Sequence, residues 1–177
     1  MNEPTHDTTR RTFNQLVAAT ALGVGLAPRA LARRAGRSAP LRWGVVGTGS
    51  IANAMANAIK AADDAVLAAV SSRRMASAEA YAKRHGAARA FDSWAEMAAS
   101  DAVDAIYVAT PTSVREEICI AAARGGKHVL GEKPLASLAS VDRIVAACEE
   151  NDVAFMDGTH FAHHPRTAAL QAEIGRA

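Results

Sequence analysis

Gly47, Gly49 and Ala52 have the Gly-x-Gly-x-x-Ala spacing of a turn that binds phosphate groups, directly after the apolar run Trp43 to Val46. Gly47 permits a tight turn, Gly49 leaves the main chain open to a pyrophosphate, and Ala52 allows close packing of helix on strand. The N-terminus of the following helix then faces the phosphates with free N–H groups and a partial positive charge. The alternative is an ordinary tight turn between a strand and a helix. In its context the pattern predicts a dinucleotide site made of Gly47, Thr48, Gly49, Ser50, Ile51 and Ala52.

The end of the second predicted strand indicates which dinucleotide is bound. An NAD site commonly has Asp or Glu about 20 residues beyond the glycine turn, where the carboxylate accepts a hydrogen bond from the ribose 2′-hydroxyl. This chain has Ser71, Ser72, Arg73 and Arg74 there instead. Two guanidinium groups without a carboxylate fit the extra charge of a 2′-phosphate. We expect NADP(H) to be preferred over NAD(H), with a solvated strand end as the alternative explanation of the arginines.

Short apolar runs alternate with alanine-rich helical patterns from Leu41 onward. This alternation is typical of a parallel sheet with crossover helices and predicts an α/β fold, a doubly wound Rossmann sheet of about six strands. The expected strands are Leu41–Gly47, Ala65–Ser71, Ala88–Phe91, Val103–Ala109, His128–Gly131 and Val153–Asp157. The helices expected between and after them include Ala76–His85, Val114–Arg124, Leu138–Glu150 and Arg166–Ile174.

The first 32 residues have the pattern of an export signal. Arg10-Arg11 precedes the apolar stretch Leu16 to Ala27, which is too short to span a bilayer, and Ala30-Leu31-Ala32 is a small-x-small cleavage pattern. The arginine pair followed by Phe13 resembles a twin-arginine signal. We expect a cleaved, periplasmic or otherwise exported protein with no membrane attachment in its mature form. The alternative is a basic, disordered tail on a cytoplasmic enzyme.

Composition restricts the class of partner. Twenty Lys and Arg against 18 Asp and Glu give a formal charge of +2, which offers no electrostatic reason for binding nucleic acid or an anionic membrane. Cys119 and Cys148 fall in helical patterns, which favours buried free thiols over a disulfide, a zinc site or a reactive pair. The expected ligand is a small molecule.

Two further segments carry a resemblance to a known family. These segments, Ile106 to Ser113 and Gly125 to Leu135, the second of which contains Glu-Lys-Pro, resemble the glucose-fructose oxidoreductase, inositol dehydrogenase and rhizopine catabolism (Gfo/Idh/MocA) family. The resemblance implies that Glu132, Lys133 and Pro134 lie beside the nicotinamide at the end of the fifth strand. It also implies that Thr110 and Pro111 line the same crevice.

Lys133 is the residue that we expect to be catalytic. At the carboxyl end of a parallel strand, a partly desolvated ammonium can donate a hydrogen bond to a substrate hydroxyl or exchange a proton with it. Glu132 could accept a hydrogen bond from the nicotinamide ribose, and Pro134, which lacks an N–H, could fix the turn that aims Lys133. The alternative is a surface turn with an exposed Glu132-Lys133 ion pair.

Three positions depart from the family's pattern. Thr112 replaces the usual Asn, Arg115 stands where a His is common, and Gly131 is smaller than the residue usually found before Glu-Lys-Pro. Contacts normally made from the turn after the fourth strand are therefore expected to differ.

His160, His163 and His164 cluster after the sixth expected strand. His160 and His164 could share a helix face, but Pro165 interrupts the segment and no carboxylate completes a ligand set. We therefore predict no metal site and assign His160 and His164 to contacts with substrate.

The family resemblance implies a second α/β domain that covers the nicotinamide, and the sequence ends before it. We predict a signal at 1–32, a linker at 33–40, the NAD(P)-binding domain at 41–160 and the start of a connection to a missing substrate domain at 161–177. The expected function is the nucleotide-binding part of an NADP-dependent oxidoreductase acting on a sugar, polyol or related hydroxyl or carbonyl compound. The alternative is a catalytically incompetent nucleotide-binding or subunit-interaction module. Homo-oligomers are expected to form through the missing domain.

Overall fold

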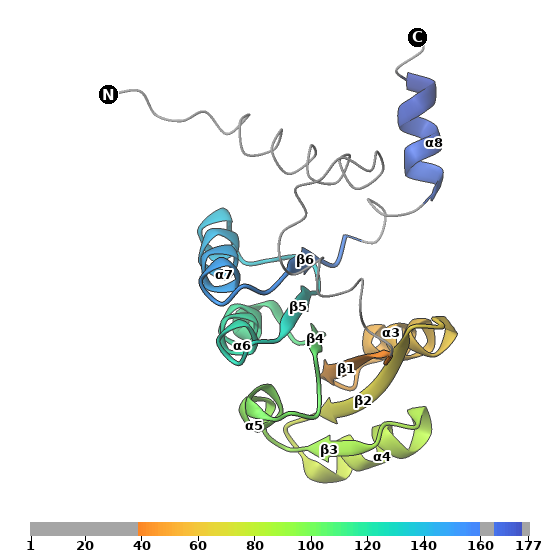
Figure 1. Ribbon diagram of the computed structural model, residues 1–177, viewed down its shortest axis with the longest axis vertical. Coiled ribbons are helices and arrows are strands. Elements are labelled where there is room, and N and C mark those ends of the chain that lie inside the picture. The colour runs from red at the N-terminus through yellow and green to blue at the C-terminus, as the bar shows by residue number, and fades with distance from the viewer. Residues whose placement is uncertain (1–38, 160–164, 175–177) are drawn as a thin grey trace. The chain divides into compact units, whose positions relative to one another are not determined.

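A computed structural model describes residues 39–159 and 165–174 (Figure 1). Its six strands are all paired in parallel, in the spatial order β3-β2-β1-β4-β5-β6. The strands are β1 (Leu41–Val46), β2 (Ala65–Ser71), β3 (Arg89–Phe91), β4 (Ala105–Val108), β5 (His128–Gly131) and β6 (Phe155–Asp157). This order confirms the predicted doubly wound Rossmann sheet, because the chain runs outward from β1 in one direction and returns to β4 on its other side.

The strand bounds agree with the predicted ones at β2 and β5, and the other strands are shorter than predicted. The edge strands β3 and β6 have three residues each, and each pairs with one neighbour among the described strands. Val103 is buried but precedes β4, whose first ladder partner to β1 is Ala105. Hydrophobicity alone could not place that boundary, because Val103 is buried as deeply as the strand itself.

Six helices are described, and their ends follow local sequence signals. They are α3 (Ser50–Ala61), α4 (Met75–His85), α5 (Trp94–Ala99), α6 (Thr112–Arg124), α7 (Leu138–Glu150) and α8 (Pro165–Ile174). α4 ends at Gly86, whose φ of 75° is a left-handed conformation that favours glycine. Ser137 caps α7 by accepting a hydrogen bond from the amide of Ser140 at 3.1 Å.

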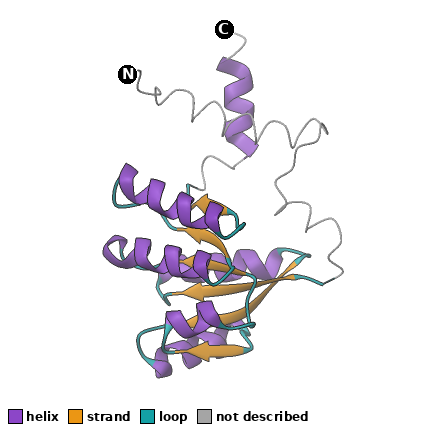
Figure 2. Ribbon diagram, turned by 60° about the vertical axis from the view of Figure 1, so that its left-hand side comes forward, coloured by secondary structure: helices purple, strands orange, loops and turns teal. Residues whose placement is uncertain are grey.

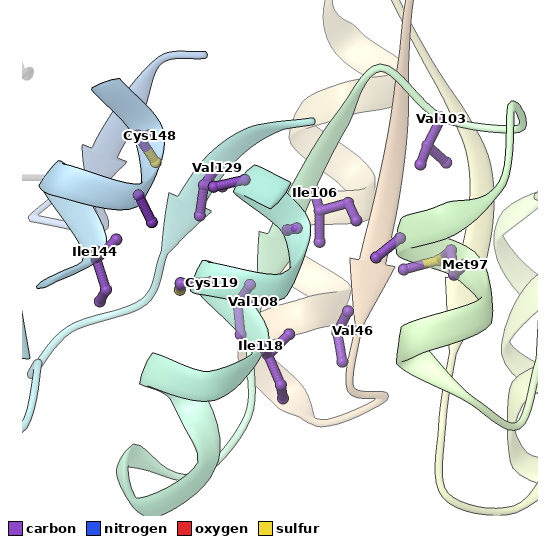
Figure 3. Packing of buried hydrophobic residues seen from close by; sticks show 14 of the residues in the cluster. Val46, Met97, Val103, Ile106, Val108, Ile118, Cys119, Val129, Ile144 and Cys148 are labelled. Carbon is purple, nitrogen blue, oxygen red and sulfur yellow. The ribbon is translucent and has the colours of Figure 1, made fainter. Parts of the chain in front are cut away.

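The core has two parts because neighbouring strand residues point to opposite faces of the sheet. Val45 and Tyr107 belong to a cluster with residues of α3 and α4, whereas Val46 and Val108 pack with α5, α6 and α7. Figure 2 shows helices packed along the sheet, and Figure 3 shows the second cluster, including Ile144 of α7. Helices therefore cover both faces, and the ends of the strands are left for a ligand.

Cys119 and Cys148 are buried free thiols on α6 and α7, as the sequence predicted. Burial raises the pKa of Cys119 to about 12 and that of Cys148 to about 11. Both groups stay protonated at neutral pH, so neither is an activated nucleophile. In the part of the chain that the structure describes, no helix is long and apolar enough to cross a membrane.

Candidate functional site

The carboxyl ends of the strands are joined by backbone hydrogen bonds that continue the sheet by one residue. These bonds run from Gly47 N to Ser71 O at 2.9 Å, from Ala109 N to Val46 O at 2.9 Å, from Glu132 N to Val108 O at 3.1 Å and from Gly158 N to Gly131 O at 2.7 Å. The loops after β1, β2, β4 and β5 therefore start side by side. In open α/β sheets, ligands bind at this edge where the strand order reverses, which here is between β1 and β4.

The two glycines of the first loop have different structural roles. Gly47 has a φ of 104°, and a Cβ atom there would lie 2.8 Å from the carbonyl oxygen of Ala109. A Cβ atom on Gly49 would meet nothing within 4 Å. Gly47 is therefore required by the fold, whereas the open space beside Gly49 is available to a ligand.

The N-terminus of α3 offers its amides to this open space. Gly49 is the N-cap residue, no side chain caps the helix within the described residues, and the first turn contains no acidic group. Uncapped N–H groups at a helix N-terminus attract phosphate. The amides of Ser50 and Ile51 belong to this first turn, and Ala52 is fully buried beneath it.

Helix α4 holds the first turn of α3 in place. The Tyr81 hydroxyl donates to the carbonyl oxygen of Ala52 at 2.6 Å, and His85 Nε2 lies 2.9 Å from Asn53 Oδ1. Desolvation, together with Lys60 and Arg84, lowers the pKa of His85. A neutral ring suits its contact with the Tyr81 ring, whose centroid lies 4.3 Å away with the two planes tilted by 37°.

The segment after β2 contains the predicted ribose-binding residues. Ser71 is buried at the end of the strand, and the Ser72 amide donates to the carbonyl oxygen of Phe91 at 3.1 Å. Arg73 and Arg74 are exposed, and Arg74 is the N-cap residue of α4. The hydrogen bond from Gly47 to Ser71 brings this segment next to the glycine loop, as a common nucleotide site requires.

Glu132 and Lys133 occupy different environments although they are adjacent. Glu132 is 5% exposed. Its Oε2 accepts a hydrogen bond from the Tyr107 hydroxyl, and its Oε1 accepts one from the Lys133 amide at 3.1 Å. Lys133 is exposed. The expected desolvation of the Lys133 ammonium stays a prediction. A ribose contact by Glu132 stays a prediction.

Hydrogen bonds connect the Lys133-Pro134 turn to the segment that follows β4. The Lys133–Pro134 peptide bond is cis, and the Pro134 carbonyl accepts hydrogen bonds from Thr112 Oγ1 at 3.3 Å and from Arg115 Nη1. Arg115 Nη2 donates to the Thr110 carbonyl. Arg115 thus connects Thr110 with Pro134, while the expectation that Thr110 and Pro111 line the nicotinamide crevice stays a prediction.

Tyr107 and Arg115 complete the site and were not predicted to be part of it. Burial raises the pKa of Tyr107, and its hydrogen bond to Glu132 raises this pKa further, so the phenol remains a proton donor. A tyrosine within the otherwise apolar run Ala105–Val108 is a signal for a buried polar contact, although its partner could not be read from the strand alone.

His160, His163 and His164 lie outside the described residues, so their assignment to substrate or metal stays a prediction. Among the described residues, no group of three or more His, Cys, Asp or Glu side chains could hold a metal ion.

The residues at the strand ends fit a dinucleotide. Gly49 leaves room for the diphosphate, the uncapped α3 terminus supplies N–H donors, and the buried Thr110 Oγ1 has no hydrogen-bond partner among the described residues. The fold and this site define a Rossmann domain that binds a dinucleotide.

The family model described as "Oxidoreductase family, NAD-binding Rossmann fold" matches residues 41–159. This chain belongs to that family, the Gfo/Idh/MocA oxidoreductases, which confirms the resemblance seen in the sequence.

Curated relatives and a solved structure are similar to this chain. It is 33% identical over 135 residues to scyllo-inositol 2-dehydrogenase (NADP(+)) IolU of Bacillus subtilis (strain 168), covering 76% of this chain and 41% of that protein. It is 38% identical over 130 residues to 1,5-anhydro-D-fructose reductase of Ensifer adhaerens, and the match covers 72% of this chain and 38% of that protein. This chain also matches the structure of KijD10, a 3-ketoreductase from Actinomadura kijaniata in complex with TDP-benzene and NADP. The TM-score is 0.73 at 30% sequence identity, and the match covers 77% of this chain and 44% of that one. The chain therefore spans about two fifths of the length of these relatives.

Proposed function

We propose that this chain is the nucleotide-binding part of an NADP-dependent oxidoreductase that transfers hydride to or from a sugar, a polyol or a related hydroxyl or carbonyl compound. The observation that carries this proposal is the juxtaposition, at one edge of the sheet, of the open Gly49 loop and the Glu132-Lys133-Pro134 turn. The loop binds the diphosphate, and the turn presents Lys133 where the nicotinamide is expected.

The choice of NADP over NAD rests on the segment after β2. No carboxylate stands between Ser71 and Arg74, and both arginine side chains are exposed next to the glycine loop. Exposed guanidinium groups are free to form charge-assisted hydrogen bonds with a 2′-phosphate. The names of two relatives, IolU with NADP(+) and KijD10 with bound NADP, support the same choice.

Lys133 is proposed as the proton donor and acceptor. The bound nicotinamide supplies or takes up the hydride. On reduction the Lys133 ammonium would give its proton to the substrate oxygen, and on oxidation the neutral Lys133 amine would take the proton that this oxygen loses. Glu132 fixes the backbone of this turn through the Lys133 amide, and Tyr107 in turn fixes the Glu132 carboxylate.

The substrate class is inferred from the relatives and from the exposure of Lys133. The relatives are named as inositol and anhydrofructose oxidoreductases, so a hydroxyl or carbonyl carbon of a polyol or sugar is proposed to face Lys133. Efficient hydride transfer requires exclusion of water, and Lys133 is exposed in the described part of the chain. Nucleotide binding without turnover is therefore the second candidate function.

We also propose that residues 1–32 direct export by a twin-arginine route. The support is the sequence pattern of Arg10-Arg11, the short apolar stretch and the small-x-small motif. N-terminal sequencing of the protein from a bacterial envelope fraction tests this: a terminus near Arg33 is expected, and an intact Met1 in the cytosol would contradict it.

The catalytic proposal is tested by assaying sugar-dependent NADPH oxidation and polyol-dependent NADP+ reduction by the full chain and by its Lys133→Met variant. Loss of turnover with unchanged NADPH affinity is expected, while the control Lys83→Met, which removes an exposed lysine on α4, leaves both unchanged. Undiminished turnover in Lys133→Met would remove the catalytic assignment. NADPH binding by a wild-type chain that turns over none of the compounds would favour the second candidate function.

A further inference from the structure

Arg115 links the two segments that follow β4 and β5. It lies near the start of α6 and is 5% exposed. One of its terminal nitrogens, Nη2, donates to the carbonyl of Thr110, and the other, Nη1, donates to the carbonyl of Pro134. A planar guanidinium can bridge two acceptors in this way, which a lysine ammonium at the same place cannot do with one geometry.

Thr112 contributes to the same link. Its hydroxyl donates to the Pro134 carbonyl at 3.3 Å and accepts from Arg115 Nη1 at 3.5 Å. Thr112 and Arg115 are the two positions in this turn where the sequence departs from the family's pattern, and both converge on one carbonyl oxygen. Thr112 and Arg115 therefore hold the Pro134 carbonyl jointly.

The placement of Arg115 is not explained by stability. A cation near the N-terminus of a helix is disfavoured by the helix dipole, and burial of a guanidinium costs desolvation energy. In the described part of the chain, Arg115 Nε is also buried without a hydrogen-bond partner. Residues that break such rules are found where a site must be held in one geometry.

We propose that Arg115 is a positioning residue that holds the Thr110-Pro111 and Lys133-Pro134 segments as one preformed surface for the nicotinamide half of the cofactor. This inference rests on the proposed function. The hydrogen bonds of Arg115 to described residues go to Thr110, Thr112 and Pro134, and not to the diphosphate loop or the Arg73-Arg74 segment, which contact the rest of the cofactor in that proposal. Its loss is therefore expected to weaken one half of the binding site selectively.

The test compares two ligands on the intact chain, NADPH and 2′,5′-ADP, which contains only the adenosine half with its 2′- and 5′-phosphates. Arg115→Met is expected to weaken NADPH binding by about tenfold or more, which corresponds to the lower value for one charge-assisted hydrogen bond, and to leave 2′,5′-ADP binding unchanged. Arg115→Lys keeps the charge but is expected to restore less than half of the lost affinity, measured on a logarithmic scale. Arg124→Met, at the exposed end of the same helix, is the matched control and leaves both affinities unchanged.

The outcomes separate this inference from the proposed function. If the wild-type chain binds both ligands and Arg115→Met binds them equally well, or loses both equally, the positioning role is overturned. Full recovery of NADPH affinity in Arg115→Lys would also overturn it, since charge alone would then suffice. A wild-type chain that binds neither ligand would overturn the proposed function, and the inference with it.

Discussion

The buried hydroxyl of Tyr107 donates a hydrogen bond to Oε2 of Glu132, joining the side chain of a core strand to the first residue of the adjacent strand-end turn. The other carboxylate oxygen of Glu132, Oε1, accepts a hydrogen bond from the Lys133 amide at 3.1 Å, so the side chain of Glu132 also holds the backbone of the turn. The geometry of the proposed catalytic turn therefore depends on a residue of the core.

Tyr107→Phe is expected to lower the free energy of unfolding by about 1–3 kcal/mol, because a buried carboxylate oxygen loses a donor while the ring shape is kept. Urea unfolding followed by circular dichroism measures this loss. The slope of the unfolding free energy against urea concentration should not change, since the surface exposed on unfolding is nearly the same. An unaltered unfolding midpoint would mean that the hydrogen bond carries no net stabilisation.

The alkaline stability of the protein is expected to depend on Tyr81. Burial raises the pKa of Tyr81 from 10.0 to about 12. Between these values the unfolded chain releases the phenol proton and the folded chain keeps it. The stabilisation is thus complete below pH 10 and is lost as the pH rises toward about 12, at up to about 1.4 kcal/mol per pH unit.

Tyr81→Phe removes this proton, so its stability is expected to fall less steeply with alkaline pH than that of the wild type. Tyr107, Cys119 and Cys148, whose pKa values are also raised, contribute equally to both proteins. Urea unfolding at a series of pH values above neutrality compares the two slopes. Parallel slopes would contradict the assignment.

Gly131 is expected to be small because Cys119 occupies the neighbouring space. A Cβ atom at Gly131 would lie 3.3 Å from Cys119 Sγ and 3.5 Å from Phe155 Cε2. Gly131→Ala is therefore expected to cost about 1–3 kcal/mol through overpacking. The cost should fall in a Cys119→Ala background, where the sulfur is absent. An equal cost in both backgrounds, measured by a double-mutant cycle of thermal unfolding, would rule out this contact as the cause.

Replacing either glycine of the first loop by alanine is expected to change the stability of the fold to different extents. Gly47→Ala should destabilise the fold by about 1–3 kcal/mol or more, because its φ of 104° is strained for alanine and its Cβ would lie 2.8 Å from a carbonyl oxygen. Gly49→Ala should cost less than about 1 kcal/mol, since its Cβ would enter open space. Chemical unfolding of the two variants under one set of conditions gives the comparison. Equal destabilisation would contradict the different roles.

The sequence predicted the parts of this structure that depend on local signals. The glycine spacing, the apolar runs and the helix stop at Gly86 each follow from the conformational preference of a few neighbouring residues. The sequence also indicated that Thr112, Arg115 and Gly131 are unusual, but the reason was not available from position alone.

The remaining contacts connect segments that are distant in the chain. Tyr107 meets Glu132 across 25 positions and Arg115 meets Pro134 across 19, so both depend on the parallel pairing of β4 and β5. The expected desolvation of Lys133 is not decided by the sequence for a related reason, since burial depends on what covers a strand end and not on the end itself. Periodicity places a side chain on a face but does not identify its partner.

The most direct test of this account is a calorimetric titration of NADPH into the purified chain and into Gly49→Ala. We predict saturable binding at one site by the wild type, and binding weakened by at least about tenfold in a variant of nearly unchanged stability, because the added methyl group occupies the space of the diphosphate. A well-folded wild-type chain that binds no NADPH, or a Gly49→Ala variant that binds as tightly as the wild type, would contradict it.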